Sequence, residues 1–68
     1  IEIGIKDSKF DNKKIMDLHV PVKAIISIMQ RRNKIIIPKG DTVIKTNDTL
    51  IIFTTTENAP MIKAYFME

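Results

Sequence analysis

Apolar residues along the chain fall into four short runs whose spacing predicts β-strands. Residues 1–5 read IEIGI, in which every second side chain is apolar, as expected for a strand with one buried face. Residues 22–29 read VKAIISIM and residues 49–54 read TLIIFT, so these two strands carry apolar side chains on both faces. The fourth run, residues 35–37, would form a hairpin with residues 22–29.

Strict alternation along residues 22–29 assigns each of their side chains to one face of the sheet. Ile26 and Ile28 would share one face, and Ile25 and Met29 would share the other. Both faces of this strand would therefore be apolar, and each of them would need a covering layer.

Turn-forming residues separate the apolar runs. Arg32 and Asn33 would form the hairpin loop, with Asn33 as the residue that tolerates a positive φ. Pro38 would occupy the second position of a type I turn that also holds Asp41, and another turn would end at Asp48. An Asp in a turn bonds its own backbone, so both aspartates are assigned to turns rather than to acid–base chemistry or a metal site.

The segment after the first strand predicts a short helix. Ile15 and Leu18 are three residues apart and would share one face of this helix. Asp11 or Asn12 would cap its N-terminus, and Phe10 would pack beside the same face.

The C-terminal segment predicts a longer, amphipathic helix. Its cap would be Thr56 or Asn58, and Pro60 is tolerated in the first turn, where no backbone donor is needed. Apolar residues at spacings of three and four would form its buried face. These residues are Met61, Ile62, Tyr65 and Phe66.

The predicted order of elements is strand, short helix, three strands and helix, which indicates an α+β fold. We expect a small antiparallel β-meander sheet, with the short helix after the first strand and the C-terminal helix on one face. One helix can cover only one side of the sheet, whereas residues 22–29 and 49–54 are apolar on both sides. We therefore expect the domain to form a homodimer through the other side.

The composition leaves association as the available source of extra stability. The chain has 68 residues, and one core of this size seldom supplies more than about 3 to 5 kcal/mol. It has no Cys and a single His, which excludes disulfides and a zinc site built from His and Cys. No nucleophile with a partner base is apparent, so we expect no catalytic or metal-binding residues and no enzymatic activity.

The net charge of +3 permits an anionic partner, but the distribution of charge argues against nucleic acid. Basic residues are interleaved with acidic ones, and no row of aromatic residues accompanies them. No apolar run approaches the roughly 18 residues of a membrane span, and the absence of Cys fits the cytoplasm. Because the first residue is Ile rather than Met, we expect the chain to be a piece of a longer protein.

Residues 12–55, NKKIMDLHVPVKAIISIMQRRNKIIIPKGDTVIKTNDTLIIFTT, resemble the C-terminal domain of the Trk and Ktr potassium-uptake regulators. This family is called the TrkA C-terminal or RCK C-terminal domain, and the most specific part of the resemblance is IIIPKGDT followed by NDTLIIF. At three positions where the family often has Gly, this chain has Asn12, Asn33 and Asn47, and Asn also visits the left-handed region. The resemblance covers nearly the whole chain, so residues 1–68 would form one such domain.

The resemblance implies a non-catalytic regulatory domain of a Trk-type potassium uptake protein. Such domains pair as homodimers, and the full-length protein would act on a membrane potassium transporter from the cytoplasmic face of the cell membrane. The family's NAD or ATP site belongs to a preceding Rossmann half, which this sequence lacks, so no cofactor is expected in this fragment. In some members cyclic di-AMP binds in the cleft between the two copies, so this or another nucleotide is the candidate ligand.

The resemblance also places candidate ligand-binding residues in and around the cleft. They are Leu18, His19, Val22, Lys23, Arg32 and Pro38. The apolar members match positions that floor the cleft of ligand-binding relatives, the two cations could neutralise phosphates, and the imidazole could contact phosphate or base.

Two alternatives stay open. The apolar candidates also suit a plain dimer core, and the basic residues suit a solvated hairpin tip, in which case the domain would be a purely structural dimerisation module. The same domain could also be appended to another ion transporter.

Overall fold

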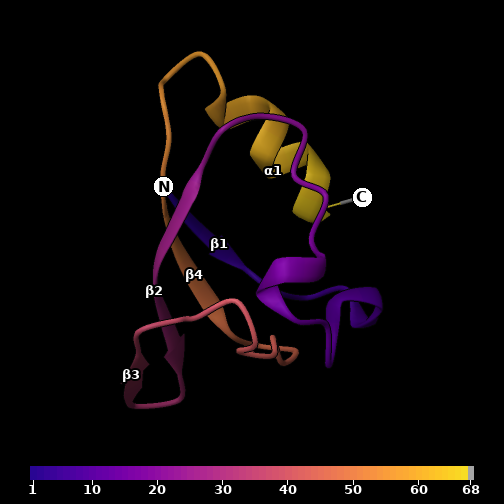
Figure 1. Ribbon diagram of the computed structural model, residues 1–68, viewed down its shortest axis with the longest axis vertical. Coiled ribbons are helices and arrows are strands. Elements are labelled where there is room, and N and C mark those ends of the chain that lie inside the picture. Colours follow the sequence, from indigo (N-terminus) through magenta and orange to yellow (C-terminus); the bar gives the residue numbers. More distant parts are fainter. Residues whose placement is uncertain (68) are drawn as a thin grey trace.

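The structure is a computed structural model that describes residues 1–67. Figure 1 shows a twisted sheet at one side of the molecule and a single α-helix across its upper end. The elements in chain order are β1 (Glu2–Gly4), the 3-10 turns η1 (Ser8–Phe10) and η2 (Ile15–Asp17), β2 (Ile25–Arg31), β3 (Lys34–Ile36), β4 (Thr49–Phe53) and α1 (Ala59–Met67). The predicted α+β class, its antiparallel sheet and its C-terminal helix are confirmed.

The four strands form one antiparallel sheet in the order β1-β4-β2-β3. Only β2 and β3 are neighbours both in sequence and in the sheet, so the order differs from the simple meander that we predicted. β2 and β4, whose sequences are apolar on both faces, occupy the centre, and the shorter β1 and β3 form the edges. The central strands are thus the ones that can lie between covering layers on both sides.

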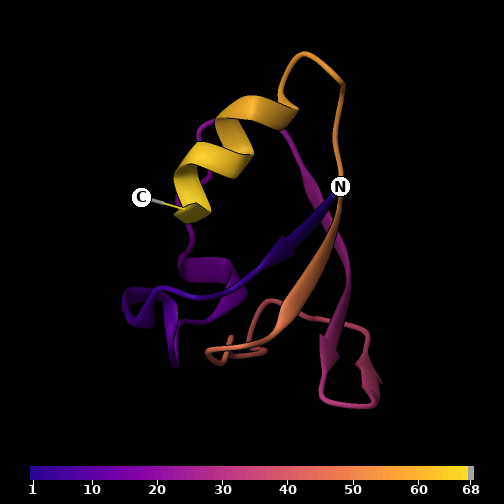
Figure 2. The ribbon, with the colours of Figure 1, turned by 180° about the vertical axis from the view of Figure 1, so that it is seen from behind.

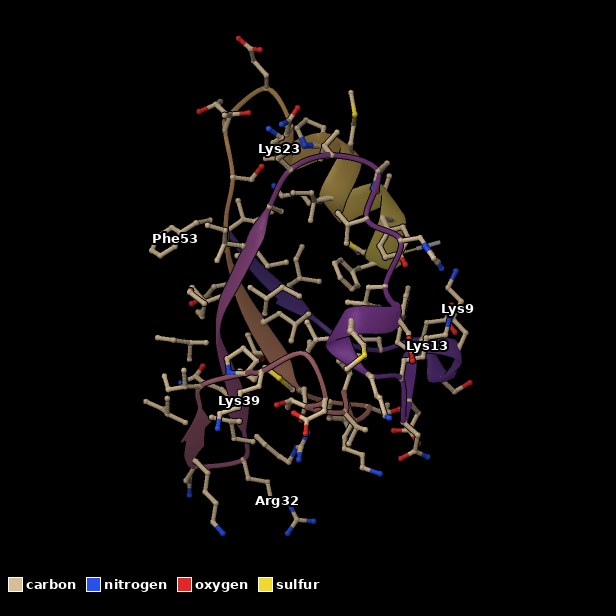
Figure 3. All side chains as sticks on the ribbon, in the orientation of Figure 1. Lys9, Lys13, Lys23, Arg32, Lys39 and Phe53 are labelled. Carbon is tan, nitrogen blue, oxygen red and sulfur yellow. The ribbon has the colours of Figure 1, made fainter. Side chains whose placement is uncertain are left out.

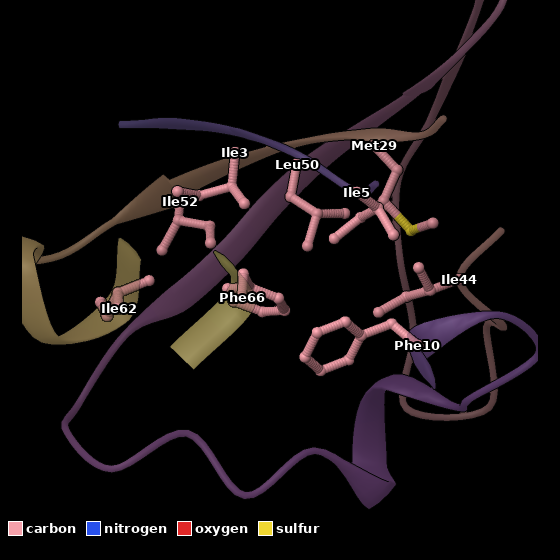
Figure 4. Close-up of a cluster of buried hydrophobic side chains, with 9 residues drawn as sticks. All are labelled: Ile3, Ile5, Phe10, Met29, Ile44, Leu50, Ile52, Ile62 and Phe66. Carbon is pink, nitrogen blue, oxygen red and sulfur yellow. The ribbon is translucent and has the colours of Figure 1, made fainter. Parts of the chain in front are cut away.

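The core lies between the sheet and a layer formed by α1 and the two 3-10 turns, as Figure 2 shows from behind. The helix contributes Ile62 and Phe66, and the Phe66 ring lies 5.2 Å from the ring of Phe10 between centroids. Figure 4 shows how these side chains meet those of the sheet. The buried cluster consists of Ile3, Ile5, Phe10, Met29, Ile44, Leu50, Ile52, Ile62 and Phe66.

A β-bulge in β2 changes the assignment of faces that strict alternation predicted. Ile26 pairs with Ile52 and Ile28 pairs with Ile51, so Ser27 is an extra residue between two pairs. Ile26 therefore shares the inner face with Met29, which is fully buried. The prediction that Ile26 and Ile28 share a face was wrong because the bulge reverses the alternation after it.

The predicted short helix is a single 3-10 turn at η2. Two of its backbone N–H groups bond to another segment: Ile15 N donates to the carbonyl of Thr42 at 2.9 Å and Met16 N to that of Gly40 at 2.9 Å. Asp17 N and Leu18 N donate to the carbonyls three residues before them, which is the 3-10 pattern, so the segment does not form an α-helix. Neither predicted cap has that role, because η2 follows Lys14, whose side chain makes no capping bond.

Two turns differ in detail from their prediction. In the β2–β3 hairpin, Arg32 has the positive φ, 57°, and Asn33 does not. Pro38 precedes the next turn, which closes through the bond from Thr42 N to the Lys39 carbonyl at 3.1 Å.

The start of α1 differs from its prediction as well. The side-chain oxygen that accepts a bond there belongs to Thr55, which receives the N–H of Asn58 at 3.2 Å. Pro60 is the second residue of α1, within the first turn as predicted. No helix within residues 1–67 is both long enough and apolar enough to cross a membrane.

Candidate functional site

The face of the sheet away from α1, called here the outer face, carries large apolar side chains that no segment within residues 1–67 covers. Ile25 pairs with Phe53, and these residues are 67% and 65% exposed. Ile35, which pairs with Gln30 on the same face, is 65% exposed, and Ile37 beyond β3 is 69% exposed. Figure 3 shows the Phe53 ring pointing away from the rest of the molecule. Such a patch marks an interaction surface.

A cleft of about 300 Å³ lies on the inner side, between α1 and the chain that leads into β2. The sequence-predicted Leu18, Val22 and Lys23 all line it, and Ile62 and Phe66 of α1 also border it. Its volume is at the lower end of the range for small-molecule pockets. The structure thus brings three of the six candidate residues together around an apolar floor with one cation.

A second, shallower hollow of about 580 Å³ connects this region to the outer face. Val22 and Lys23 line it together with Ile25 and Phe53. The predicted ligand residues at the start of β2 are therefore next to the uncovered apolar surface. A molecule bound there would also touch any partner that covers the outer face.

The other three candidates lie outside the cleft of a single copy. The His19 residue is exposed, and its backbone N–H donates to Oη of Tyr65 at 3.0 Å. Arg32 is at the tip of the β2–β3 hairpin, at the opposite end of the molecule from Lys23 in Figure 3. Pro38 is half-buried just before the Lys39–Thr42 turn. One copy therefore does not gather all six residues.

The turn residue Asp48 has a role that its sequence position did not reveal. Within residues 1–67 it is the one buried charged residue, with 1% of its surface exposed. Its carboxylate accepts bonds from Arg31 Nε at 2.9 Å and Nη2 at 2.8 Å, and from the N–H of Lys45 at 2.8 Å. Arg31 Nη2 also donates to the Val43 carbonyl at 3.0 Å. Arg31 thereby ties β2 to the segment before β4.

The two charged groups of this pair stabilise each other in their ionised forms. Burial alone would raise the pKa of Asp48, but the hydrogen bonds from Arg31 and Lys45 and their positive charges outweigh burial and lower that pKa. The hydrogen bond to Asp48 raises the pKa of Arg31 despite its partial burial. A signal for this pair was present in the sequence only as two opposite charges far apart along the chain.

The described part of the chain contains no candidate metal site. Across residues 1–67 there is no group of three or more His, Cys, Asp and Glu side chains that could hold an ion. The arrangement offers apolar contact surface, a small cleft and hydrogen-bonding groups, which suit binding.

Similarity to known proteins indicates which kind of domain the chain forms. The chain is 39% identical over 67 residues to the Trk system potassium uptake protein TrkA homolog of Archaeoglobus fulgidus. This alignment covers 97% of the chain but only 15% of the relative, so the chain spans about one seventh of that protein.

Two solved structures share the fold. One, described as "Structure of RCK domain with cda", has a TM-score of 0.90 and 26% identity, with 97% of this chain and 94% of that chain covered. The other is the RCK_C domain dimer of S. agalactiae BusR in complex with c-di-AMP, with a TM-score of 0.85, 27% identity, and coverage of 98% and 93%. The family described as the TrkA-C domain matches residues 1–67. The chain therefore belongs to the TrkA-C domain family.

Proposed function

We propose that this domain is the non-catalytic regulatory and dimerisation module of a Trk-type potassium uptake protein, and that it controls cation transport. Its relation to a TrkA homologue and to RCK domains supports this role. The domain would be one part of a longer chain, at the cytoplasmic side of the membrane, where that chain contacts a potassium transporter subunit. NAD or ATP would bind only to another part of that chain.

The observation that carries the proposal is the uncovered outer face. Ile25, Ile35 and Phe53 would lose their exposure to water if a second copy packed against this face. Burial of apolar surface contributes about 25 cal/mol per Å², and a domain of 68 residues needs such a contribution. The dimer formed by the BusR domain supports a homodimer here.

We further propose that a nucleotide of the cyclic di-AMP type binds where the inner cleft meets the outer face. Leu18 and Val22 would contact its apolar surface, and the ammonium group of Lys23 would pair with a phosphate. His19 follows the cleft residue Leu18 in the chain, and in the assembled pair His19 and Pro38 would also contact the ligand. Because the second copy would border the same region, the ligand would favour one arrangement of the pair, and that bias would reach the transporter.

Sedimentation velocity of the domain at micromolar concentration tests the dimer. The wild-type domain should sediment as a dimer, and Phe53→Glu should sediment as a folded monomer because a carboxylate would be buried in the interface. Met61→Glu is the matched control, since Met61 is 51% exposed on α1, away from the outer face. Dimers of the Phe53→Glu variant would contradict the proposed interface, and a wild-type monomer would contradict the dimer itself.

Isothermal titration with cyclic di-AMP tests the ligand. Binding to the wild type and loss of affinity in Lys23→Gln would support a nucleotide cleft. A dimeric domain that binds no cyclic di-AMP would instead be the purely structural module.

A further inference from the structure

A basic hollow of about 690 Å³ lies at the hairpin end of the molecule, remote from the nucleotide cleft. Residues 31–34 line it from the hairpin, and residues 45–48 line it from the turn before β4. In Figure 1 the hairpin and α1 are at opposite ends of the vertical axis, which is the longest, at 29 Å. The hollow and the inner cleft therefore share no residue and lie on different parts of the fold.

The charge in this hollow is strongly positive because its carboxylate is already neutralised. Four cations line it, Arg31, Arg32, Lys34 and Lys45, against the single carboxylate of Asp48. Arg31 and the buried Asp48 form an ion pair, and 4 − 1 leaves a net charge of +3 on the residues that line the hollow, while the Asp11 carboxylate accepts bonds from Thr46 at its edge. No carboxylate of residues 1–67 pairs with the remaining three cations. The Nζ of Lys45 donates to the neutral amide oxygen of Asn12 rather than to a carboxylate.

The backbone of Arg32 gives a second indication that this cation has a function. Arg32 adopts a φ of 57° at the hairpin tip, where Gly or Asn would be accommodated with less strain. Strained residues of this kind concentrate at functional sites. Arg32 and Lys34, which flank Asn33 in the hairpin loop, both line the hollow.

We propose that this hollow binds a small soluble anion that carries several phosphate groups, such as inorganic triphosphate or the polyphosphate of a nucleotide. Its volume suits a ligand of that size. A guanidinium group matches the geometry of phosphate oxygens, and the two ammonium groups add charge without demanding a fixed angle. The net charge of +3 complements a polyphosphate rather than a single carboxylate. This assigns Arg32 to the hairpin hollow and not to the nucleotide cleft.

Nuclear magnetic resonance titration with sodium triphosphate at low salt tests the site. Amide shifts should concentrate in residues 32–34 and 45–47, and the affinity should fall as salt rises. The double variant Arg32→Gln with Lys34→Gln should bind at least about tenfold more weakly, because it removes two charge-assisted contacts. Lys63→Gln is the matched control, since it removes one exposed cation from α1 at the other end of the molecule.

The single variant Arg32→Gly separates binding from folding. Gly relieves the strain of the left-handed conformation, so this variant should melt no lower than the wild type while binding triphosphate more weakly. Unchanged affinity in Arg32→Gly would overturn the role of Arg32. Absence of wild-type binding, or an equal loss in Lys63→Gln, would overturn the site, because the latter would indicate attraction by net charge alone.

Two further measurements define the ligand. Cyclic di-AMP should bind the double variant with the same affinity as the wild type, because the proposed nucleotide cleft and the hairpin hollow are separate sites. A negative result for one site then leaves the other unaffected. Flotation with phosphatidylglycerol vesicles, without any binding of triphosphate, would identify a membrane surface and overturn the proposal of a soluble ligand.

Discussion

The substitution Asp48→Asn should remove most of the stability of the isolated domain. The carboxylate accepts three hydrogen bonds, two from Arg31 and one from the N–H of Lys45, and it is 1% exposed. An amide group has one acceptor oxygen, and its NH₂ group would face at least one of these donors. The variant loses charge-assisted bonds and leaves a buried donor without a partner, which together cost about 3 kcal/mol. That is comparable with the roughly 3 to 5 kcal/mol that a core of this size supplies.

Urea unfolding at neutral pH measures this cost, and Asp41→Asn is the matched control. Asp41 is exposed in a turn, so the same change there should alter the free energy of unfolding by less than about 0.5 kcal/mol. A cost for Asp48→Asn no larger than that of the control would refute the reasoning that the buried pair holds the sheet to the 43–48 segment.

The pH dependence of the difference in unfolding free energy between the wild type and Asp48→Asn gives an independent check. Since the pKa of Asp48 is lowered in the folded domain, its ionised form contributes stability that is fully present above the ordinary carboxyl pKa, near 4. That contribution is lost as pH falls through this value toward the lower pKa of the folded state. The gap between wild type and Asp48→Asn should therefore narrow below about pH 4. A gap that stays constant down to acid unfolding would contradict the assigned pair.

Two further changes test how α1 is held against the rest of the domain. Ile62→Ala should cost about 2 to 5 kcal/mol in urea unfolding, because the fully buried Ile62 side chain borders the inner cleft. Met61→Ala, at a half-exposed neighbour, should cost far less, and equal costs would contradict the orientation of the helix. Tyr65→Phe should remove the bond from His19 N and cost about 0.5 to 1 kcal/mol. Hydrogen exchange at His19 should become faster in that variant, and an unchanged rate would show that the Tyr65 hydroxyl does not protect it.

Much of the fold could be predicted because strands and an amphipathic helix leave a local periodic signal. Residues 49–54 were predicted from an unbroken apolar run, and β4 occupies 49–53 at the centre of the sheet. The η2 segment could not be predicted in the same way. Ile15 and Leu18 have helical spacing, but the backbone donors of this segment bond to residues 40 and 42, which only the tertiary fold brings near.

The candidate site was predicted in part for a similar reason. Leu18, Val22 and Lys23 are close in sequence, so a local resemblance could place them around one cleft. Arg32 is separated from them by the length of β2, and its distance in space depends on the direction of that strand. The ion pair of Asp48 with Arg31 depends on the pairing of β2 with β4, which periodicity does not specify.

The bulge at Ser27 marks a position at which β2 can change in length without changing its register with β4. Before Ser27 the even-numbered Ile26 faces the core, and after Ser27 the odd-numbered Met29 does. The alternation of inward and outward side chains therefore changes phase at Ser27. Deletion of Ser27 would remove the bulge and leave a regular strand in which Met29 still faces the core and Arg31 still reaches Asp48, whereas deletion of a residue elsewhere in β2, with the bulge kept, would turn the residues on one side of the deletion to the opposite face. Related sequences that lack one residue at the bulge should therefore keep the same pattern of core and surface residues up to the hairpin, whereas those that lack one elsewhere in the strand should show compensating changes.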